Sequence, residues 1–570
     1  MKQMLSLFLC VLLLAGCGNS TVAEVTAQTQ PPKAPSPVEK VVFTALEYVS
    51  RFDTVTEITL SDAGIQVNGG EETESVFTSR DIIYYENRDT YDSGNPYGEG
   101  EASEKHTAEE AASHTVVNIT APGAYRISGS LSAGQIRIDL EEDASENPEA
   151  VVELILNNAD ITCSVAPAIL FLNTYECDNN WSVETVKADV DTTSAGANLI
   201  LEGQNHVNGS HVAKIFKDKA EEKKLWKQDG AIYSYQSMNV FGPGSLELTA
   251  DNEGLDTELH LTINGGNISI YSDNDGINTN EDGVSVTTIN GGTLTIYAGL
   301  GAEGDGIDSN GYLVINGGTV FSSAKPISDA GLDSDLGSFI HGGTVIAMGS
   351  TMDWAESNSR QVTMNLQFAS QQAAGSKISI TKEDGTEIFS FTDSGTYARG
   401  FSGLILSHAN FTQGETYHVY IDGVQMAYTG TDVGFGSGGF GGRPGGMTPG
   451  GMPEGFNPNQ MPENFNPGQM PEGFDPGQNP GFPGGDMPEG FDPSQMAGGR
   501  GQRPNGKDKN PPENFDGFGG FGGKMPNGEM PEMPQGGFPG RGQDNVPSGE
   551  SNTAFYMNDM VNSFSGVAPA

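Results

Sequence analysis

The feature that most constrains the fold of this chain is a repeat of 25 or 26 residues. Pairs of glycines, each following a short apolar run, begin at positions 265, 291, 317 and 342. Before each pair stands a second element, Glu/Asp/Ala-Gly-Leu/Ile-Asp/Asn, at 253–256, 275–278, 305–308 and 330–333. A unit this short cannot bury its own apolar face, so neighbouring units must stack and share one core. The repeat therefore predicts a solenoid.

The repeats consist of short strand-like runs joined by glycine and asparagine corners, with no helical pattern between them. Asn264, Asn290 and Asn316 recur at one corner, where asparagine suits stacking or left-handed backbone geometry. A degenerate earlier copy starts at Asp229. These observations predict an all-β fold whose repeat core, residues 229–360, is a parallel β-helix.

The flanking regions differ in composition. Residues 38–210 alternate apolar and polar residues and predict an N-terminal β region leading into the β-helix. The lysine-rich segment 211–228 predicts a helix-like surface insert. Residues 361–430 predict a small β cap with a hairpin at Asp384-Gly385.

A low-complexity region spans residues 434–570. A nine-residue unit that begins at Met452 recurs there, and its prolines and glycines oppose regular structure. We expect a disordered tail in which the last 20 residues form a short amphipathic helix. Its regular phenylalanines and methionines also leave open a docking role for a protein partner.

The N-terminus predicts export. Residues 1–17 carry one lysine, a short apolar run and Leu-Ala-Gly-Cys, which resembles a bacterial lipoprotein signal ending at Cys17. We expect a lipid on Cys17, a flexible tether over residues 18–37, and a protein anchored to the cell membrane and displayed at the cell surface. Cys163 and Cys177 remain for either a disulfide or two buried thiols.

The charge of the chain excludes some partners. With 75 acidic and 28 basic residues, the formal net charge is −47. Nucleic acids and anionic lipid surfaces require clustered lysine and arginine, so neither is expected as a partner beyond the lipid anchor.

The acidic residues concentrate in the repeats. Residues 229–350 contain 16 acids against one base, Lys325. In a stacked solenoid, equivalent turns lie about 4.8 Å apart, and unpaired carboxylates at that spacing repel unless a cation lies between them. We therefore predict calcium, with aspartate as a simple turn former as the alternative. The candidate ligands are Asp251, Asp256, Asp273, Asp275, Asp305, Asp308, Asp333 and Asp335.

The lipoprotein signal, the repeats and a capping segment ending at Tyr417–Gly423 together resemble the bacterial surface family of carbohydrate-binding domain-containing proteins, over about residues 110–430. The resemblance implies a right-handed parallel β-helix similar in shape to pectate lyases, with calcium at its turns. It also implies binding of cellulose or acidic pectic chains without demonstrated cleavage. The lysine-rich insert and the long tail depart from the pattern.

The residues support a binding role, because sugar rings stack on exposed aromatic side chains. The candidates are Tyr233, Tyr235, Tyr271, Tyr297, Tyr312 and Trp354. Two alternatives remain open. A polysaccharide lyase needs a base, for which Lys325 is the one candidate in residues 229–350. A structural or adhesive protein would bind its partner through the tail.

Overall fold

The computed structural model describes residues 47–85, 104–216, 224–326, 328–350, 353–431 and 551–570. The lipoprotein signal with Cys17, the tether and the nine-residue repeats lie outside these residues. The chain divides into two units, of which one spans residues 1–440 and 548–570 and the other spans residues 441–547. All described residues belong to the first unit. Its helices in the described ranges are too short or too polar to cross a membrane.

The described chain is almost entirely β, as the sequence predicted. The helical elements are α1 (Ala108–Ser113) and a single 3-10 turn, η1 (Ala144–Glu146). Helix α1 starts with a capping box, in which the side chains of Thr107 and Glu110 each accept from the other's backbone N–H.

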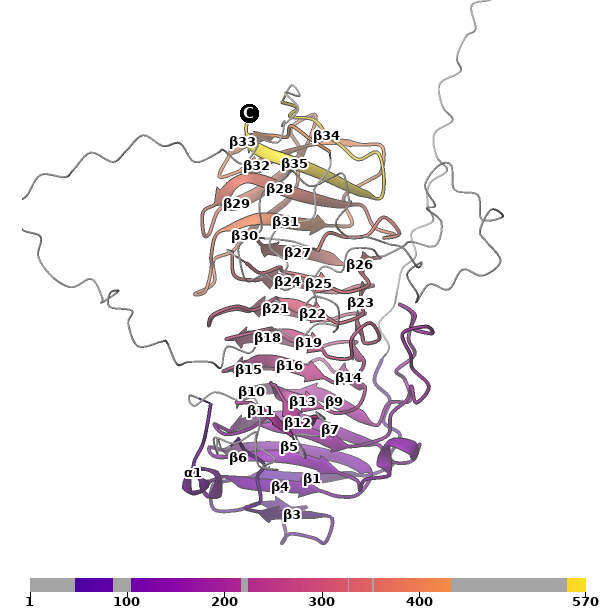
Figure 1. Ribbon diagram of the computed structural model, residues 1–570, viewed down its shortest axis with the longest axis vertical. Helices are drawn as coiled ribbons and strands as arrows, with labels where there is room; N and C mark the ends of the chain where they lie inside the picture. The colour runs from indigo at the N-terminus through magenta and orange to yellow at the C-terminus, as the bar shows by residue number, and fades with distance from the viewer. Residues whose placement is uncertain (1–46, 86–103, 217–223, 327, 351–352, 432–550) are drawn as a thin grey trace, which may run out of the picture. The chain divides into compact units, whose positions relative to one another are not determined.

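Most strands stack in parallel rows, one strand of each row per coil of the chain (Figure 1). The first row contains β4 (Thr115–Ile119), β6 (Gly134–Asp139), β8 (Ile169–Asn173), β13 (Gly230–Ser234), β16 (Glu253–Thr257), β19 (Ile277–Thr279), β22 (Ile307–Ser309) and β25 (Asp333–Ser334), with β3 (Val76–Ser79) antiparallel at its end. The other two rows belong to one large sheet, in which parallel and antiparallel pairs both occur.

The second row contains β9 (Ala197–Glu202), β14 (Met238–Phe241), β17 (Leu261–Ile263), β20 (Val286–Ile289), β23 (Tyr312–Ile315) and β26 (Gly337–Ile340). The third row contains β10 (Gln204–Gly209), β15 (Ser245–Ala250), β18 (Asn267–Ser272), β21 (Thr293–Tyr297), β24 (Thr319–Ser323) and β27 (Thr344–Gly349). Before them lie the longer strands β1 (Val55–Leu60), β5 (Gly123–Leu131) and β7 (Val152–Thr162), with the short β2 (Gln66–Val67) antiparallel to β1.

The strand register follows the sequence repeat. Leu294 of β21 pairs with Ile268 of β18 and with Val320 of β24, in steps of 26 residues. All three side chains are fully buried in one continuous core. Parallel pairing begins well before the repeats, at β1 with β5.

A polar ladder and tight glycines form the corner between the second and third rows. Asn316 donates from Nδ2 to Oδ1 of Asn290 over 2.8 Å, and Asn290 donates likewise to Asn264 over 2.9 Å. Gly318 has φ +81°, and a Cβ there would lie 2.8 Å from the carbonyl oxygen of Gly292 in the preceding coil. Both the backbone angle and the space require glycine.

The cap is a mixed sheet that continues the third row. It contains β28 (Thr363–Gln372), β29 (Lys377–Lys382), β30 (Glu387–Thr392), β31 (Phe401–Ser407), β32 (Thr416–Ile421), β33 (Val424–Ala427), β34 (Phe555–Tyr556) and β35 (Val561–Pro569). Strand β31 pairs antiparallel with β27, and β29 and β30 form the hairpin predicted at Asp384-Gly385.

Two expectations about secondary structure are wrong. Residues 551–570 form β34 and β35 rather than a helix, because their alternating apolar side chains fill the core of the cap. The lysine-rich segment forms an antiparallel ribbon of β11 (Val212–Phe216) and β12 (Lys224–Gln228) rather than a helix. Val212 pairs with Gln228, so the insert leaves and re-enters the fold at adjacent points, which a ribbon satisfies.

Cys163 and Cys177 are free thiols, so the disulfide alternative is wrong. Cys163 packs in the main core, whereas Cys177 lies beside Glu176 and Ser237. Burial raises the pKa of both thiols to about 12.

We predict that Gly318→Ala destabilises the fold by about 2–4 kcal/mol, since it adds both backbone strain and a clash with the neighbouring coil. Gly385→Ala is the matched control, because Gly385 also has a positive φ (+85°) but open space around it. It should lose only about 1 kcal/mol. Unfolding in urea measures both losses. If Gly318→Ala and Gly385→Ala lose the same unfolding free energy, the contact of Gly318 with the neighbouring coil does not contribute to stability.

Candidate functional site

Acidic side chains occupy two equivalent positions of successive coils along the first row. Asp256, Asn278, Asp308 and Asp333 pair with one another in register through β16, β19, β22 and β25. Two residues before the inward Leu or Ile of each strand lie Glu253, Asp275 and Asp305. The repeat thus places carboxylates in two columns on one side of the stack. We call this surface the acidic face.

Burial and mutual repulsion raise the pKa values of these carboxyls. The pKa of Asp275 is raised well above its usual range, first by burial and then by the charges of Glu253 and Asp308. Burial and the charge of Asp333 raise the pKa of Asp305 to about 8. At the end of the row, burial and Asp333 raise the pKa of Asp353 to about 7. If all these carboxyls were ionised with no cation beside them, their mutual repulsion would destabilise the folded state.

Among the residues that the structure describes, Asp229, Glu253 and Asp256 form a group of three carboxylates that could hold a metal ion. One oxygen atom from each lies within 4.8 Å of the other two. Glu253 is 5% exposed and its Oε2 atom is buried without a hydrogen-bond partner. The Asp256 Oδ1 atom accepts from Nδ2 of Asn280 over 2.5 Å. A buried carboxylate oxygen without a donor requires either a proton or a cation.

The eight predicted metal ligands separate into two groups. Asp256, Asp275, Asp305, Asp308 and Asp333 lie together on the acidic face, and Asp335 lies close enough to raise the pKa of Asp308.

Asp251 and Asp273 lie at another turn. The Asp251 oxygens accept from Ser210 Oγ over 2.6 Å and contact His211 Nδ1 over 3.0 Å, so we leave Asp251 out of the ligand set. Asp273 is partly buried, and Asp251 adds to the rise of its pKa. We leave Asp273 out as well.

Sequence reasoning left Asp229, Glu253 and Asp353 out of the candidate ligands. Glu253 occupies the same repeat position as Asp275 and Asp305, so the repeat alignment could have found it. Asp353 follows the repeats, and no pattern in the sequence marks it. Its Oδ2 atom accepts from the backbone N–H of Ser334 over 3.1 Å.

A group of tyrosines lies on the outer side of the third row, where the cap meets the coils. The rings of Tyr271 and Tyr297 stack in parallel with centroids 5.9 Å apart. Tyr397, in the loop before β31, packs against them at 5.3 and 6.0 Å and is 44% exposed. Tyr297 is itself buried, and it donates from its hydroxyl to Asp393 Oδ1 over 2.6 Å. We call Tyr271, Tyr297 and Tyr397 the tyrosine cluster.

The other aromatic candidates lie elsewhere. Tyr233 is fully buried and donates to Glu258, so it cannot stack on a sugar, and that expectation is wrong. Tyr235 contacts Tyr233 edge-on, and Tyr312 packs against Phe339. Trp354 is half-buried against the main core. Sequence reasoning missed Tyr397, because it lies outside the repeats.

Lys325 does not present a free amine. Its Nζ donates to the carbonyl oxygens of Gly301, over 2.7 Å, and Ala302. Nearby, Arg399 donates from Nη1 to the carbonyl oxygen of Gly299 over 3.3 Å. The two cations therefore hold one loop of the stack rather than projecting from it.

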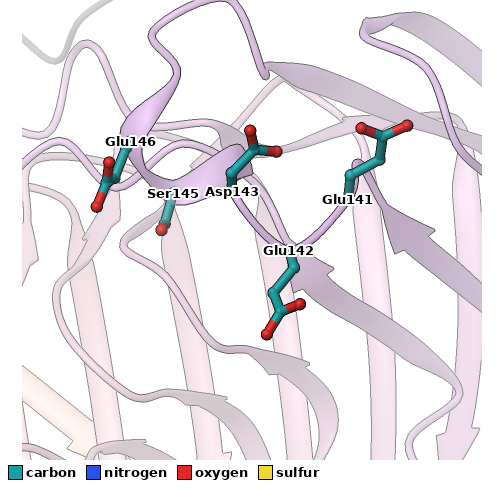
Figure 2. Close-up of a pocket in the computed structure, with 5 residues that line it drawn as sticks. All are labelled: Glu141, Glu142, Asp143, Ser145 and Glu146. Atoms are coloured by element: carbon teal, nitrogen blue, oxygen red, sulfur yellow. The ribbon is translucent and has the colours of Figure 1, made fainter.

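A cavity of about 550 Å³ lies against the turn between β6 and β7. Four of its lining residues are acidic: Glu141, Glu142, Asp143 and Glu146. Figure 2 shows that these carboxylates point in different directions and do not converge on one point. We assign no ligand to this cavity.

We predict a pH-dependent stabilisation at His211, which contacts Asp251 Oδ1 and Glu104 Oε1. These acids raise its pKa from 6.5 to about 9 despite burial, and His106 also interacts with it electrostatically. Because the folded-state pKa is raised, the stabilisation is complete below about pH 6.5 and is lost as pH rises through 9. His211→Gln should lower the unfolding free energy most at pH 6 and least at pH 10. A difference that is constant across this range would contradict the charged contact.

The chain resembles known proteins over the region that contains the parallel coils. The profile of the family described as "Carbohydrate-binding domain-containing protein" matches residues 113–401. A protein of that name from Acetivibrio thermocellus (strain ATCC 27405) is 30% identical over 155 residues, which are 27% of this chain and 44% of the relative. The chain thus matches less than half the length of this curated relative.

A solved structure of a "polysaccharide lyase-like protein from C. thermocellum", a gadolinium derivative, aligns with 51% of this chain and 93% of its own at 18% identity. Its TM-score is 0.29, which is too low to establish a shared fold. The family match covers half of the chain, and on that ground the protein belongs to the carbohydrate-binding domain-containing family.

Proposed function

We propose that this protein is a cell-surface lipoprotein, anchored through Cys17, that binds polysaccharide without cleaving it. Its binding domain is a right-handed parallel β-helix stabilised by calcium, and its ligand is cellulose or an acidic pectic glycan. The observation that carries the proposal is the tyrosine cluster, which presents aromatic surface beside the coils of a chain from a carbohydrate-binding family. Tyrosine rings stack on the apolar faces of sugars.

The acidic face supports calcium as the stabilising cation. Neighbouring charges about 4.8 Å apart repel by about 3 kcal/mol per pair at an effective dielectric constant of 20. Calcium takes six to eight oxygen ligands in flexible geometry, and carboxylates are its commonest protein ligands. The buried Oε2 atom of Glu253, with Asp229 and Asp256 beside it, is a donor set of this kind. The residues present therefore fit the cation.

Lys325 supports a binding role over a lyase role. A lyase base must be free to take a proton from bound substrate, within hydrogen-bond reach of it. The Lys325 amine is instead engaged by two carbonyl oxygens of the stack.

Chelation should lower the stability of the protein, because a cation that binds only the folded state stabilises it by about 2.7 kcal/mol at 100 times its Kd. We expect the melting temperature to fall when EDTA replaces calcium. Glu253→Gln should remove a large part of this calcium-dependent rise, whereas the exposed Glu247→Gln should leave it unchanged. A wild-type melting temperature that is the same in calcium and in EDTA would contradict the calcium proposal.

Tyr397→Ala should weaken retention on insoluble cellulose or on polygalacturonate by about 3- to 10-fold, the value of one aromatic stacking contact. The control is Tyr556→Ala, which removes another exposed tyrosine, 49% accessible, from the cap. Binding is measured by depletion from solution over a series of glycan amounts. Equal affinity of wild type and Tyr397→Ala for every glycan would remove the tyrosine cluster as the binding surface.

A further inference from the structure

A cavity of about 190 Å³ lies against the outer side of the second row, near its first strands. Asn198 of β9 and Asn239 and Phe241 of β14 line it, and these strands follow β7 in the stack (Figure 1). The three side chains alternate with Leu199 and Val240, which pack in the main core, so they point outward. We call this cavity the N-terminal pocket.

The segment that precedes β1 forms one side of the N-terminal pocket and is held in place by Glu153. This carboxylate is 2% exposed and accepts from the Tyr48 hydroxyl and from Ser50 Oγ, both over 2.5 Å. It also accepts from the backbone N–H of Arg51 over 2.8 Å. The Tyr48 ring packs against Phe241 with centroids 5.7 Å apart. The pocket therefore has a fixed side that combines aromatic surface with a buried hydrogen-bond network.

Two buried amides supply fixed polar groups to the pocket. Asn239 donates from Nδ2 to Oδ1 of Asn198 over 3.1 Å and to the carbonyl oxygen of Thr192 over 2.8 Å. Asn198 donates from Nδ2 to the carbonyl oxygen of Ala195 over 3.0 Å. A primary amide has two N–H donors and an oxygen with two lone pairs. These bonds orient both amides and use only part of their capacity, so the pair can also bond a ligand.

Arg51 supplies further donors at the same pocket. Its Nη2 donates to the carbonyl oxygen of Thr193, which also lines the pocket, over 2.8 Å. A guanidinium carries five N–H donors in one rigid plane, so this bond fixes the group and leaves donors for a ligand. Planar groups of this kind bond two neighbouring hydroxyls at once, while aromatic rings such as Phe241 cover an apolar face. The combination is suited to a polyhydroxylated ring.

Size and charge narrow the ligand. The volume equals that of about six water molecules in the liquid and is below the roughly 300–1,000 Å³ of pockets that take drug-sized ligands. It therefore suits one sugar ring rather than a run of chain. The charged residues that line it are the acids Glu47 and Glu153 and the base Arg51. This excess of negative charge disfavours a uronate.

We propose that the N-terminal pocket binds one neutral sugar residue, at the end of a glycan chain or on a side branch. Phe241 and Tyr48 contact the apolar face of the ring, and Arg51 with the amides of Asn198 and Asn239 bonds its hydroxyls. The choice of a sugar as ligand rests on the proposed carbohydrate-binding function. The pocket shares no residue with the tyrosine cluster, so the two sites can be tested separately.

The test measures binding of single sugars to the full chain by saturation-transfer difference NMR. The probes are the methyl α- and β-glycosides of glucose, galactose, mannose and xylose, with methyl galacturonoside as the charged comparison. We expect at least one neutral glycoside to bind with a Kd of about 1–10 mM, the range for a ligand of about 13 non-hydrogen atoms. Arg51→Gln and Phe241→Leu should each weaken it by about 3- to 10-fold, and the galacturonoside should bind more weakly than the neutral glycoside.

Two matched variants control for general damage. Arg80 is exposed like Arg51 and also donates to one backbone carbonyl oxygen, that of Ser113, over 2.8 Å. Phe339 is a partly exposed ring on the outer side of the same row, packed against Tyr312. Arg80→Gln and Phe339→Leu should leave the affinity for the glycoside unchanged.

Tyr397→Ala separates this pocket from the proposed polysaccharide surface. It should weaken retention on polysaccharide and leave binding of the glycoside unchanged. Glycoside binding that persists while no polysaccharide is retained would support the pocket and contradict the proposed function. The pocket proposal would be overturned if no neutral glycoside bound, if the galacturonoside bound more tightly, or if Tyr397→Ala rather than Arg51→Gln and Phe241→Leu abolished binding.

Discussion

The repulsion between carboxylates at equivalent positions of stacked coils is the constraint on which the rest of this structure depends. Parallel stacking brings each turn about 4.8 Å from the next. An acid that recurs in the repeat then faces an acid one coil away, as Asp308 faces Asp333, whereas Asn278 separates Asp256 from Asp308. Apolar burial of Ile268, Leu294 and their equivalents favours the stack, whereas its charges oppose it. Burial raises the pKa values of Asp305 and Asp353, and the charge of Asp333 raises both further.

The two outer surfaces carry different kinds of side chain. The first row carries the acidic face, where we propose that calcium relieves the repulsion. The third row carries the tyrosine cluster beside Arg399, which interacts electrostatically with Asp393, Asp329 and Tyr297. In the proposed function, calcium on the acidic face stabilises the fold and the tyrosine cluster binds glycan.

The repeat, the all-β character and the cap hairpin at Asp384-Gly385 could be predicted, because each has a local signature of spacing or turn chemistry. The ribbon at 212–228 could not, since its fold depends on where the chain leaves and re-enters the stack. Residues 551–570 resembled a helix because their apolar spacing is ambiguous over so short a segment. The places of Asp275 and Asp305 could be predicted from the repeat, whereas only the tertiary fold brings Asp353 to the acidic face and Tyr397 to the tyrosine cluster.

The location of bound calcium tests the role of the acidic face most directly. A crystal grown in calcium, measured at a wavelength where calcium scatters anomalously, would show whether a cation lies beside Glu253. We predict an anomalous peak about 2.4 Å from carboxylate oxygens of Glu253, Asp229 and Asp256. A well-ordered acidic face with no anomalous peak, and with water or protons satisfying Glu253, would contradict this role.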